Sequence, residues 1–197
     1  HSLIGKKLRG HMGQSEMAAL CILQGGTMKL IIAEKPSVAL FIAKVVGASS
    51  RKDGYIQGNG YMVSWCVGHL IQMASPDKYD EKYAKWNLDD LPILPKDFKY
   101  EVSKNTKKQY GVLKKLLHLK EVDTVIYACD AGREGELIFR LDYEEAKCKK
   151  PIKRLWISSM EDESIRKGIE SLASGKDFEN LFESAKSRAI AEWLVRI

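Results

Sequence analysis

The stretch Thr124-Val-Ile-Tyr-Ala-Cys129 runs directly into Asp130-Ala-Gly-Arg-Glu-Gly-Glu136, and the rest of the chain can be placed around it. Its first half is dominated by apolar and β-branched residues, a pattern typical of a buried strand. Its second half is an acidic turn containing glycines, and the apolar spacing from Leu137 onward predicts a helix over residues 134–147. Such turns from strand to helix carry the chemistry of parallel α/β sheets, so the stretch predicts an α/β fold with a site at Asp130.

The acidic turn by itself allows two interpretations. Asp130, Glu134 and Glu136 place three carboxylates within seven residues, and such groups repel one another unless a hard cation such as Mg²⁺ lies between them. Acids at the start of a helix also cap it and interact favourably with its dipole. The turn alone therefore leaves metal binding and helix capping open.

A second strand ends in charged residues. The strand predicted over residues 29–33, apolar from Leu30 onward, is followed by Glu34 and Lys35, and Pro36 then occupies the first turn of a helix predicted over residues 36–46. Two strand ends would therefore present charged groups to one cleft.

Ala33-Glu34-Lys35-Pro36-Ser37, taken with the motif from Asp130 to Glu136, resembles the TOPRIM domain of type IA DNA topoisomerases, and most closely the bacterial topoisomerase III branch. The likeness extends from Met28 to the C-terminus through Gly68-His69-Leu70, Trp86 to Pro92, Arg154 to Ser159 and Arg188 to Val195. The resemblance implies a Rossmann-like, mainly parallel sheet flanked by helices, with an inserted β-hairpin.

The resemblance also implies roles for the charged residues. Glu34 would act as general acid or base at the 3′ oxygen and share the metal, and Lys35 would stabilise charge at the scissile phosphate. Asp130 and Glu134 would bind Mg²⁺. The family pattern Asp-x-Asp-x-Glu has Gly132 at its middle acid here, so Glu34, Glu136 or water would complete the coordination.

Contacts to single-stranded DNA are expected from Lys35 and from Arg133, His69, Trp86, Ser159, Arg188 and Trp193. Several of these residues have a structural alternative. His69 is typical of a hydrogen-bonding group, Trp86 of an aromatic that packs on its own loop, and Ser159 of a helix cap. Arg188 and Glu192 have the spacing of an intrahelical ion pair. Glu192 and Arg196 also replace the usual Asp and Gly of the family.

The resemblance to the TOPRIM domain also implies a domain organisation. Residues 1–27 are interpreted as a tag or vector-encoded leader, residues 28–174 as the TOPRIM domain, and residues 175–197 as the start of a following helical domain. Type IA enzymes break and reseal one DNA strand through a 5′-phosphotyrosine. None of the eight tyrosines matches the context of that nucleophile, so this chain is predicted to need the remaining topoisomerase domains for cleavage.

Composition is compatible with this hypothesis without establishing it. The net charge of +6 and the pI of about 9.0 favour a polyanionic partner. Four cysteines (Cys21, Cys66, Cys129 and Cys148) show neither zinc spacing nor a disulfide framework, which indicates reduced thiols in the cytoplasm. The resemblance implies a bacterial protein associated with the nucleoid. No apolar run approaches the roughly 18 residues of a membrane span.

The remaining pattern predicts a hairpin over residues 54–67 around Asn59-Gly60, with its tip overhanging the cleft. We expect a long ordered loop over residues 77–100, a strand over 152–157, and helices over 106–119 and 178–197. The helix that follows Ser159 is expected to end at Gly175.

Two other classes of function stay open. The domain could belong to a TOPRIM primase or OLD-type nuclease. It could also be a noncatalytic α/β nucleotide-binding module, although neither G-x-x-x-x-G-K-[ST] nor G-x-G-x-x-G follows the first strand.

Overall fold

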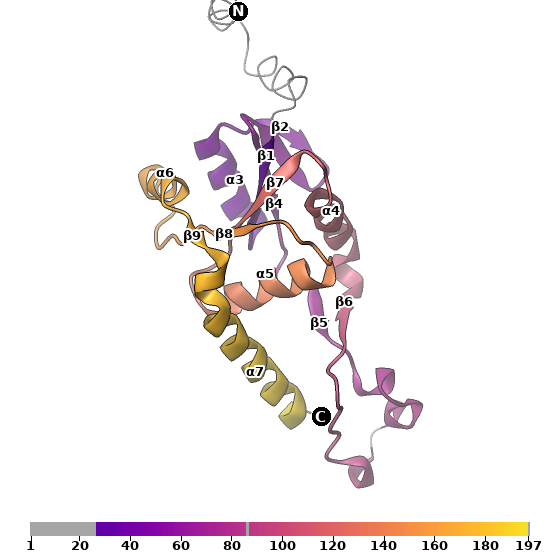
Figure 1. Ribbon diagram of the computed structural model, residues 1–197. Helices are drawn as coiled ribbons and strands as arrows, with labels where there is room; N and C mark the ends of the chain where they lie inside the picture. Colours follow the sequence, from indigo (N-terminus) through magenta and orange to yellow (C-terminus); the bar gives the residue numbers. More distant parts are fainter. Residues whose placement is uncertain (1–26, 86, 197) are drawn as a thin grey trace, which may run out of the picture.

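A seven-stranded sheet forms the centre of the protein (Figure 1). The computed structural model describes residues 27–85 and 87–196. In sheet order the strands are β2 (Ser50–Lys52), β3 (Tyr55–Gly58), β4 (Tyr61–Trp65), β1 (Met28–Ala33), β7 (Val122–Ala128), β8 (Ile152–Arg154) and β9 (Ala173–Ser174). Strands β4, β1, β7 and β8 are parallel, whereas the pairings of β2 with β3, β3 with β4 and β8 with β9 are antiparallel. The predicted mainly parallel α/β architecture is confirmed.

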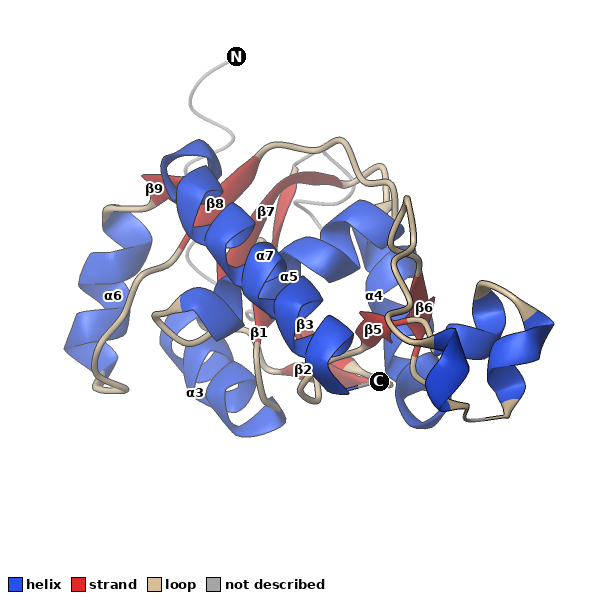
Figure 2. Ribbon diagram, turned by 90° about the horizontal axis from the view of Figure 1, so that it is seen from below, coloured by secondary structure: helices blue, strands red, loops and turns tan. Residues whose placement is uncertain are grey.

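Helices cover both faces of the sheet (Figure 2). They are α3 (Pro36–Val46), α4 (Lys107–Leu117), α5 (Arg133–Glu145), α6 (Asp162–Glu170) and α7 (Glu179–Arg196). Successive strand residues point to opposite faces. Leu30 and Ile32 therefore pack with residues of α4 and α5, and Ile31 and Ala33 pack with residues of α3 and α6. None of the described helices is long and apolar enough to cross a bilayer.

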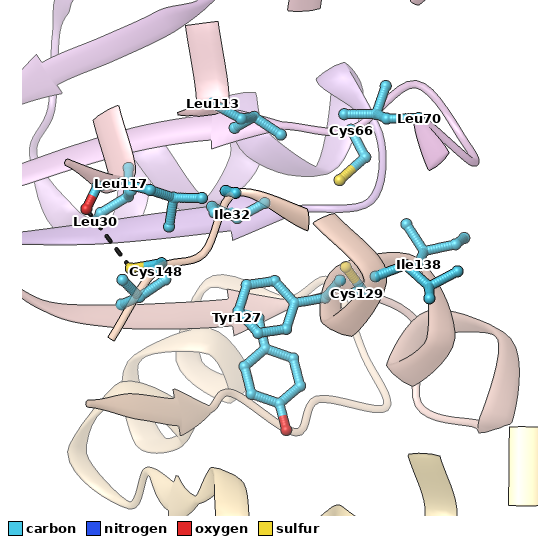
Figure 3. Packing of buried hydrophobic residues seen from close by; sticks show 14 of the residues in the cluster. Leu30, Ile32, Cys66, Leu70, Leu113, Leu117, Tyr127, Cys129, Ile138 and Cys148 are labelled. Carbon is cyan, nitrogen blue, oxygen red and sulfur yellow. Dashed lines mark hydrogen bonds between the residues drawn. The ribbon is translucent and has the colours of Figure 1, made fainter. Parts of the chain in front are cut away.

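The core on the α4 and α5 side is built from residues far apart in the sequence (Figure 3). Leu30 and Ile32 of β1 meet Leu113 and Leu117 of α4, and Ile138 of α5 belongs to the same cluster. Burying a large aliphatic side chain stabilises a fold by roughly 1.5–3 kcal/mol, so this cluster fixes α4 and α5 on the sheet.

The predicted hairpin forms within the predicted residues, but its turn does not lie over the cleft. Asn59 and Gly60 both have positive φ (49° and 79°), as a tight hairpin turn requires. Strand β4 pairs in parallel with β1, with Ala33 opposite Trp65, so the hairpin belongs to the central sheet. The Asn59 amide donates to the carbonyl of Val46, at the far end of α3 from Lys35. The expectation that the turn overhangs the cleft is therefore wrong, because parallel pairing places the turn at the opposite edge.

The segment between β4 and α4 contains two strands that the sequence pattern did not predict. β5 (Ile71–Met73) and β6 (Tyr100–Val102) form a separate antiparallel pair. Between them lie three short 3₁₀ turns, Pro76–Lys78, Glu81–Ala84 and Leu88–Asp90, so the expected long ordered loop is otherwise confirmed. Trp86 lies outside the described residues.

Two predicted boundaries are wrong at the C-terminal side. Strand β8 ends at Arg154 and not at residue 157, and α6 ends at Glu170, before Gly175. The chain after α6 returns to pair with β8 as β9, and Gly175 lies so close to Ile152 that a Cβ there would be 2.5 Å from its Cγ1. The predicted domain boundary at residues 174/175 stays a prediction, and α7 packs on the same core through Phe182 and Ala185.

Candidate functional site

The C-terminal ends of β1 and β7 bring the two predicted charged segments together. Ala33 and Ala128 are paired in the parallel register, so the residues that follow them leave the same edge of the sheet. Glu34 Oε2 accepts a hydrogen bond from the backbone N–H of Asp130 at 3.0 Å. Glu34 is only 7% exposed, whereas Asp130 is exposed. The Glu34 carboxylate is thus buried and held by a hydrogen bond, beside the exposed residue Asp130.

Lys35 places a positive charge between these two acids. Its Nζ lies 3.6 Å from Asp130 Oδ2 and 3.4 Å from Glu34 Oε1. The carboxylates of Asp130 and Glu34 raise the pKa of Lys35, so its ammonium form is favoured. Lys35 is the N-cap residue of α3 and directly precedes Pro36.

A third strand end contributes His69. Gly68, with φ of 79°, turns the chain after β4, and His69 Nε2 then lies 2.5 Å from Glu134 Oε1 at the start of α5. The side chain of Glu134 is 72% exposed. Strands β4, β1 and β7 are neighbours in the sheet, and the groups that follow them therefore line one edge.

Glu136 lies elsewhere, in a buried position that speaks against its predicted role as a metal ligand. Its carboxylate is fully buried and accepts hydrogen bonds from Tyr127 Oη (2.7 Å) and Arg140 Nε (3.1 Å). Residues two apart on a helix are rotated by about 200°, so Glu136 points into the core while Glu134 points to solvent. Burial and the bond to Glu136 raise the pKa of Tyr127, which stays a neutral donor.

Arg154 is a buried residue whose role the sequence did not reveal. Its Nη1 donates to the carbonyl of Cys129 and its Nη2 to the carbonyl of Asp130, both at 2.8 Å. Its Nε lies 3.6 Å from Glu136 Oε2, so the two buried charges compensate each other. The only sequence signal was a pair of basic residues, Lys153 and Arg154, inside the strand predicted over residues 152–157. Arg154 therefore holds the backbone of the turn that presents Asp130.

Gly135 allows α5 to begin directly against this turn. A Cβ at this position would lie 2.2 Å from the carbonyl oxygen of Asp130, a distance that real Cβ atoms essentially never show. The glycine in the motif is thus required by close approach of the backbone.

Arg133 and Ser159 occupy ordinary positions near element ends. Arg133 is exposed in the first turn of α5. Ser159 Oγ accepts a hydrogen bond from the N–H of Glu161 at 3.3 Å in the turn before α6, but Glu161 is the N-cap residue of that helix and α6 has no side-chain capping bond, so Ser159 does not cap it. DNA contact by either residue stays a prediction.

On α7 the expected intrahelical ion pair is observed. Arg188 Nε lies 2.9 Å from Glu192 Oε1, and this hydrogen bond lowers the pKa of Glu192.

Trp193 Nε1 donates to the carbonyl of Ala74 at 3.0 Å, and its ring makes edge contacts with Tyr79 and Phe98. Trp193 thus anchors the segment between β5 and β6 on α7. A cavity of about 380 Å³ lies beside it and is lined by His69, Ile71, Tyr100, Leu137, Trp193 and Arg196 among others.

The carboxylates of the site suit a hard cation, although they do not form a complete set of metal ligands in this structure. Within residues 27–85 and 87–196, no three His, Cys, Asp or Glu side chains are arranged to hold an ion. Glu34 and Asp130 nevertheless already surround one positive charge, the ammonium of Lys35. Carboxylate oxygens are the ligands that Mg²⁺ prefers, and Mg²⁺ commonly keeps several waters. The donor set therefore suits Mg²⁺ bound through few protein ligands.

Comparison with known proteins supplies a family for these features. The family model described as "Toprim domain" matches residues 29–160. The protein named DNA topoisomerase 3 from Bacillus cereus is 48% identical over 166 residues, which cover 84% of this chain and 23% of that protein. The Bacillus subtilis protein of the same name is 46% identical over 168 residues, covering 85% and 23%. The chain thus spans about a quarter of the length of these curated relatives.

One solved structure is also similar, that of full-length topoisomerase I from Thermotoga maritima. It matches with a TM-score of 0.49 and 23% identity, over 74% of this chain and 21% of that chain.

Proposed function

Since the chain belongs to the Toprim domain family, we propose that it is the metal- and DNA-binding part of a type IA topoisomerase of the topoisomerase III branch. The intact enzyme would break and reseal single DNA strands through a 5′-phosphotyrosine supplied by its remaining domains. One observation carries the proposal: Glu34, Lys35 and Asp130 converge at the ends of two adjacent parallel strands. The substrate would place the protein in the bacterial cytoplasm, with the nucleoid.

Glu34 and Lys35 would act on the DNA directly. Lys35 is more than half exposed at the sheet edge, where its ammonium would stabilise charge on the scissile phosphate. Glu34 is held by the Asp130 N–H, and its carboxyl would exchange a proton with the 3′ oxygen. Glu34 is only 7% exposed, so little water would compete for its carboxyl.

Asp130 and Glu134, with Glu34, would hold Mg²⁺. The ion would neutralise phosphate charge and align the 3′ end for resealing. His69 would orient Glu134 through the hydrogen bond that joins them. Arg133 would add positive charge for the phosphate backbone at the start of α5.

Calorimetric titration of Mg²⁺ into the chain with a single-stranded oligonucleotide tests this proposal. Asp130→Ala and Glu34→Ala should both abolish binding while circular dichroism stays unchanged. Glu163→Gln is a matched control, because Glu163 is an exposed acid on α6 that pairs only with Lys167 among the described residues. Equal binding in all four proteins would reject the proposed site and leave the acidic turn with a capping role.

The proposal that DNA cleavage needs the remaining domains can be tested separately. The chain by itself should bind a single-stranded oligonucleotide without forming a covalent adduct that survives denaturing electrophoresis. Detection of such an adduct would show that a tyrosine of this chain is a nucleophile, contrary to the proposal.

A further inference from the structure

A column of stacked side chains runs from Phe178, in the 3₁₀ turn Gly175–Phe178 just before α7, to the acidic turn. The rings of Phe178 and Trp156 are 5.2 Å apart and 15° from parallel. Arg154 Cζ lies 5.0 Å from the ring of Trp156 and 4.7 Å from that of Tyr127. Tyr127 in turn stacks on Phe139 at 4.1 Å. Arg154 is therefore enclosed between two aromatic rings.

The Arg154 guanidinium depends on this enclosure. Arg154 is completely buried, and its charge is compensated by Glu136 and by the carbonyls of Cys129 and Asp130. Hydrogen bonds from a charged group are stronger when water is excluded. Trp156 is itself 45% exposed, so its ring separates the guanidinium from solvent.

We propose that Trp156 and Phe178 are positioning residues for Asp130, acting through Arg154. Without the indole, water reaches the guanidinium and competes with the Cys129 and Asp130 carbonyls for its N–H groups. The turn then loosens, and Asp130 loses its fixed place beside Glu34. The consequence for metal affinity rests on the proposed function, whereas the consequence for the turn does not.

A second contact ties the same two regions together. Arg140 Nη2 donates to the carbonyl of Gly175 at 2.6 Å and lies 3.2 Å from Glu179 Oε2. Its Nε donates to Glu136, the acid that compensates Arg154. The 3₁₀ turn Gly175–Phe178 and the first residue of α7 therefore contact the residues that support the acidic turn at two points, Phe178 and the pair Gly175 and Glu179. A displacement of the start of α7 would be transmitted to Asp130.

Amide hydrogen exchange without metal tests the positioning role. Trp156→Leu should speed exchange in residues 129–135 by about tenfold, Phe178→Leu less, and Trp156→Phe, which keeps a stacked ring, hardly at all. Phe41→Leu is the matched control, because Phe41 is 48% exposed on α3. Unchanged exchange in Trp156→Leu would overturn the proposal, because the indole would then not hold the turn. An equal rise of exchange in α4 would also overturn it, because the effect would not be confined to the turn.

Titration with Mn²⁺, followed by electron paramagnetic resonance, then measures the effect on metal. Trp156→Leu should bind Mn²⁺ about three- to tenfold more weakly than the parent, and Trp156→Phe should match the parent. Equal affinity in Trp156→Leu would overturn the positioning of Asp130. Absence of Mn²⁺ binding by the parent would reject the proposed function instead, and the exchange experiment would still decide the role of Trp156.

Discussion

Glu134 and Glu136 stand two residues apart in the first turn of α5, in opposite environments. The Glu134 side chain is 72% exposed and bonds to His69 at the sheet edge. Glu136 is fully buried and bonds to Tyr127 and Arg140. The difference shows that two acids of one motif can lie in solvent and in the core, and that the rotation along the helix decides which acid is exposed and which is buried.

The contrast extends to two groups of ionisable residues. The strand-end cluster comprises the exposed residues Lys35, His69, Asp130 and Glu134 together with Glu34, which is 7% exposed, and the buried layer comprises Glu136, Arg140, Asp142 and Arg154. Solvent-exposed ion pairs contribute little to stability, whereas a buried charge that loses its partner is strongly destabilising. Substitutions in the two groups should therefore have separable effects.

Glu136→Ala should have the largest effect on stability. It leaves Arg154 and Arg140 without their buried carboxylate, which costs about 3–5 kcal/mol of unfolding free energy. Glu136→Gln should cost less, because the amide keeps the shape and one acceptor. Urea denaturation measures both values. A loss below about 1 kcal/mol for Glu136→Ala would show that the buried layer is not stabilised by charge compensation.

Asp142 should make stability depend on pH. Burial raises the pKa of Asp142 from 3.8 to about 7, although a hydrogen bond from Cys66 Sγ at 3.2 Å acts in the opposite direction. The folded state then holds a proton that the unfolded state releases, so stability falls as pH rises from about 4 to about 7, by about 3–4 kcal/mol in total.

Asp142→Asn is the test of this dependence. The variant should lack the decline when unfolding free energies are compared at about pH 4.5 and about pH 7.5. A decline of the same size in the parent and the variant would assign the titration to another group.

Gly135→Ala should have an intermediate effect. The added Cβ would lie 2.2 Å from the Asp130 carbonyl oxygen, so the backbone must shift, at a cost of about 1–3 kcal/mol. Gly111→Ala on α4 is the matched control, because no atom lies within 4 Å of its Cβ, and it should stabilise the protein by roughly 0.5–1 kcal/mol. Thermal unfolding compares the two, and equal shifts would disprove the close approach.

Glu134→Gln should have the smallest effect on folding. Its carboxylate is mostly exposed, so the unfolding free energy should change by less than about 0.5 kcal/mol. The same protein should bind Mg²⁺ more weakly in calorimetry, because an amide replaces a charged ligand. A large loss of stability with unchanged Mg²⁺ binding would reverse the distinction drawn between Glu134 and Glu136.

Local signals in the sequence were sufficient for much of the fold. Apolar periodicity located β1, α3, β7 and α5, and the Asn59-Gly60 dipeptide located the hairpin. Glu34, Lys35 and Asp130 were found because each directly follows a buried strand, and neighbouring parallel strands end at one edge. These features depend only on residues close together in the chain.

What the sequence could not specify depends on contacts between distant segments. The pairing of β4 with β1 moved the hairpin turn to the far edge, and the path of the chain brought Ala74 to Trp193 on α7. Glu136 looked like a ligand because its partner Arg154 is 18 residues away and on another strand. The sequence by itself determined which segments are strands and helices and which acids follow them. Only the tertiary structure decided which charges are buried together, because burial is set by the packing of elements and not by local composition.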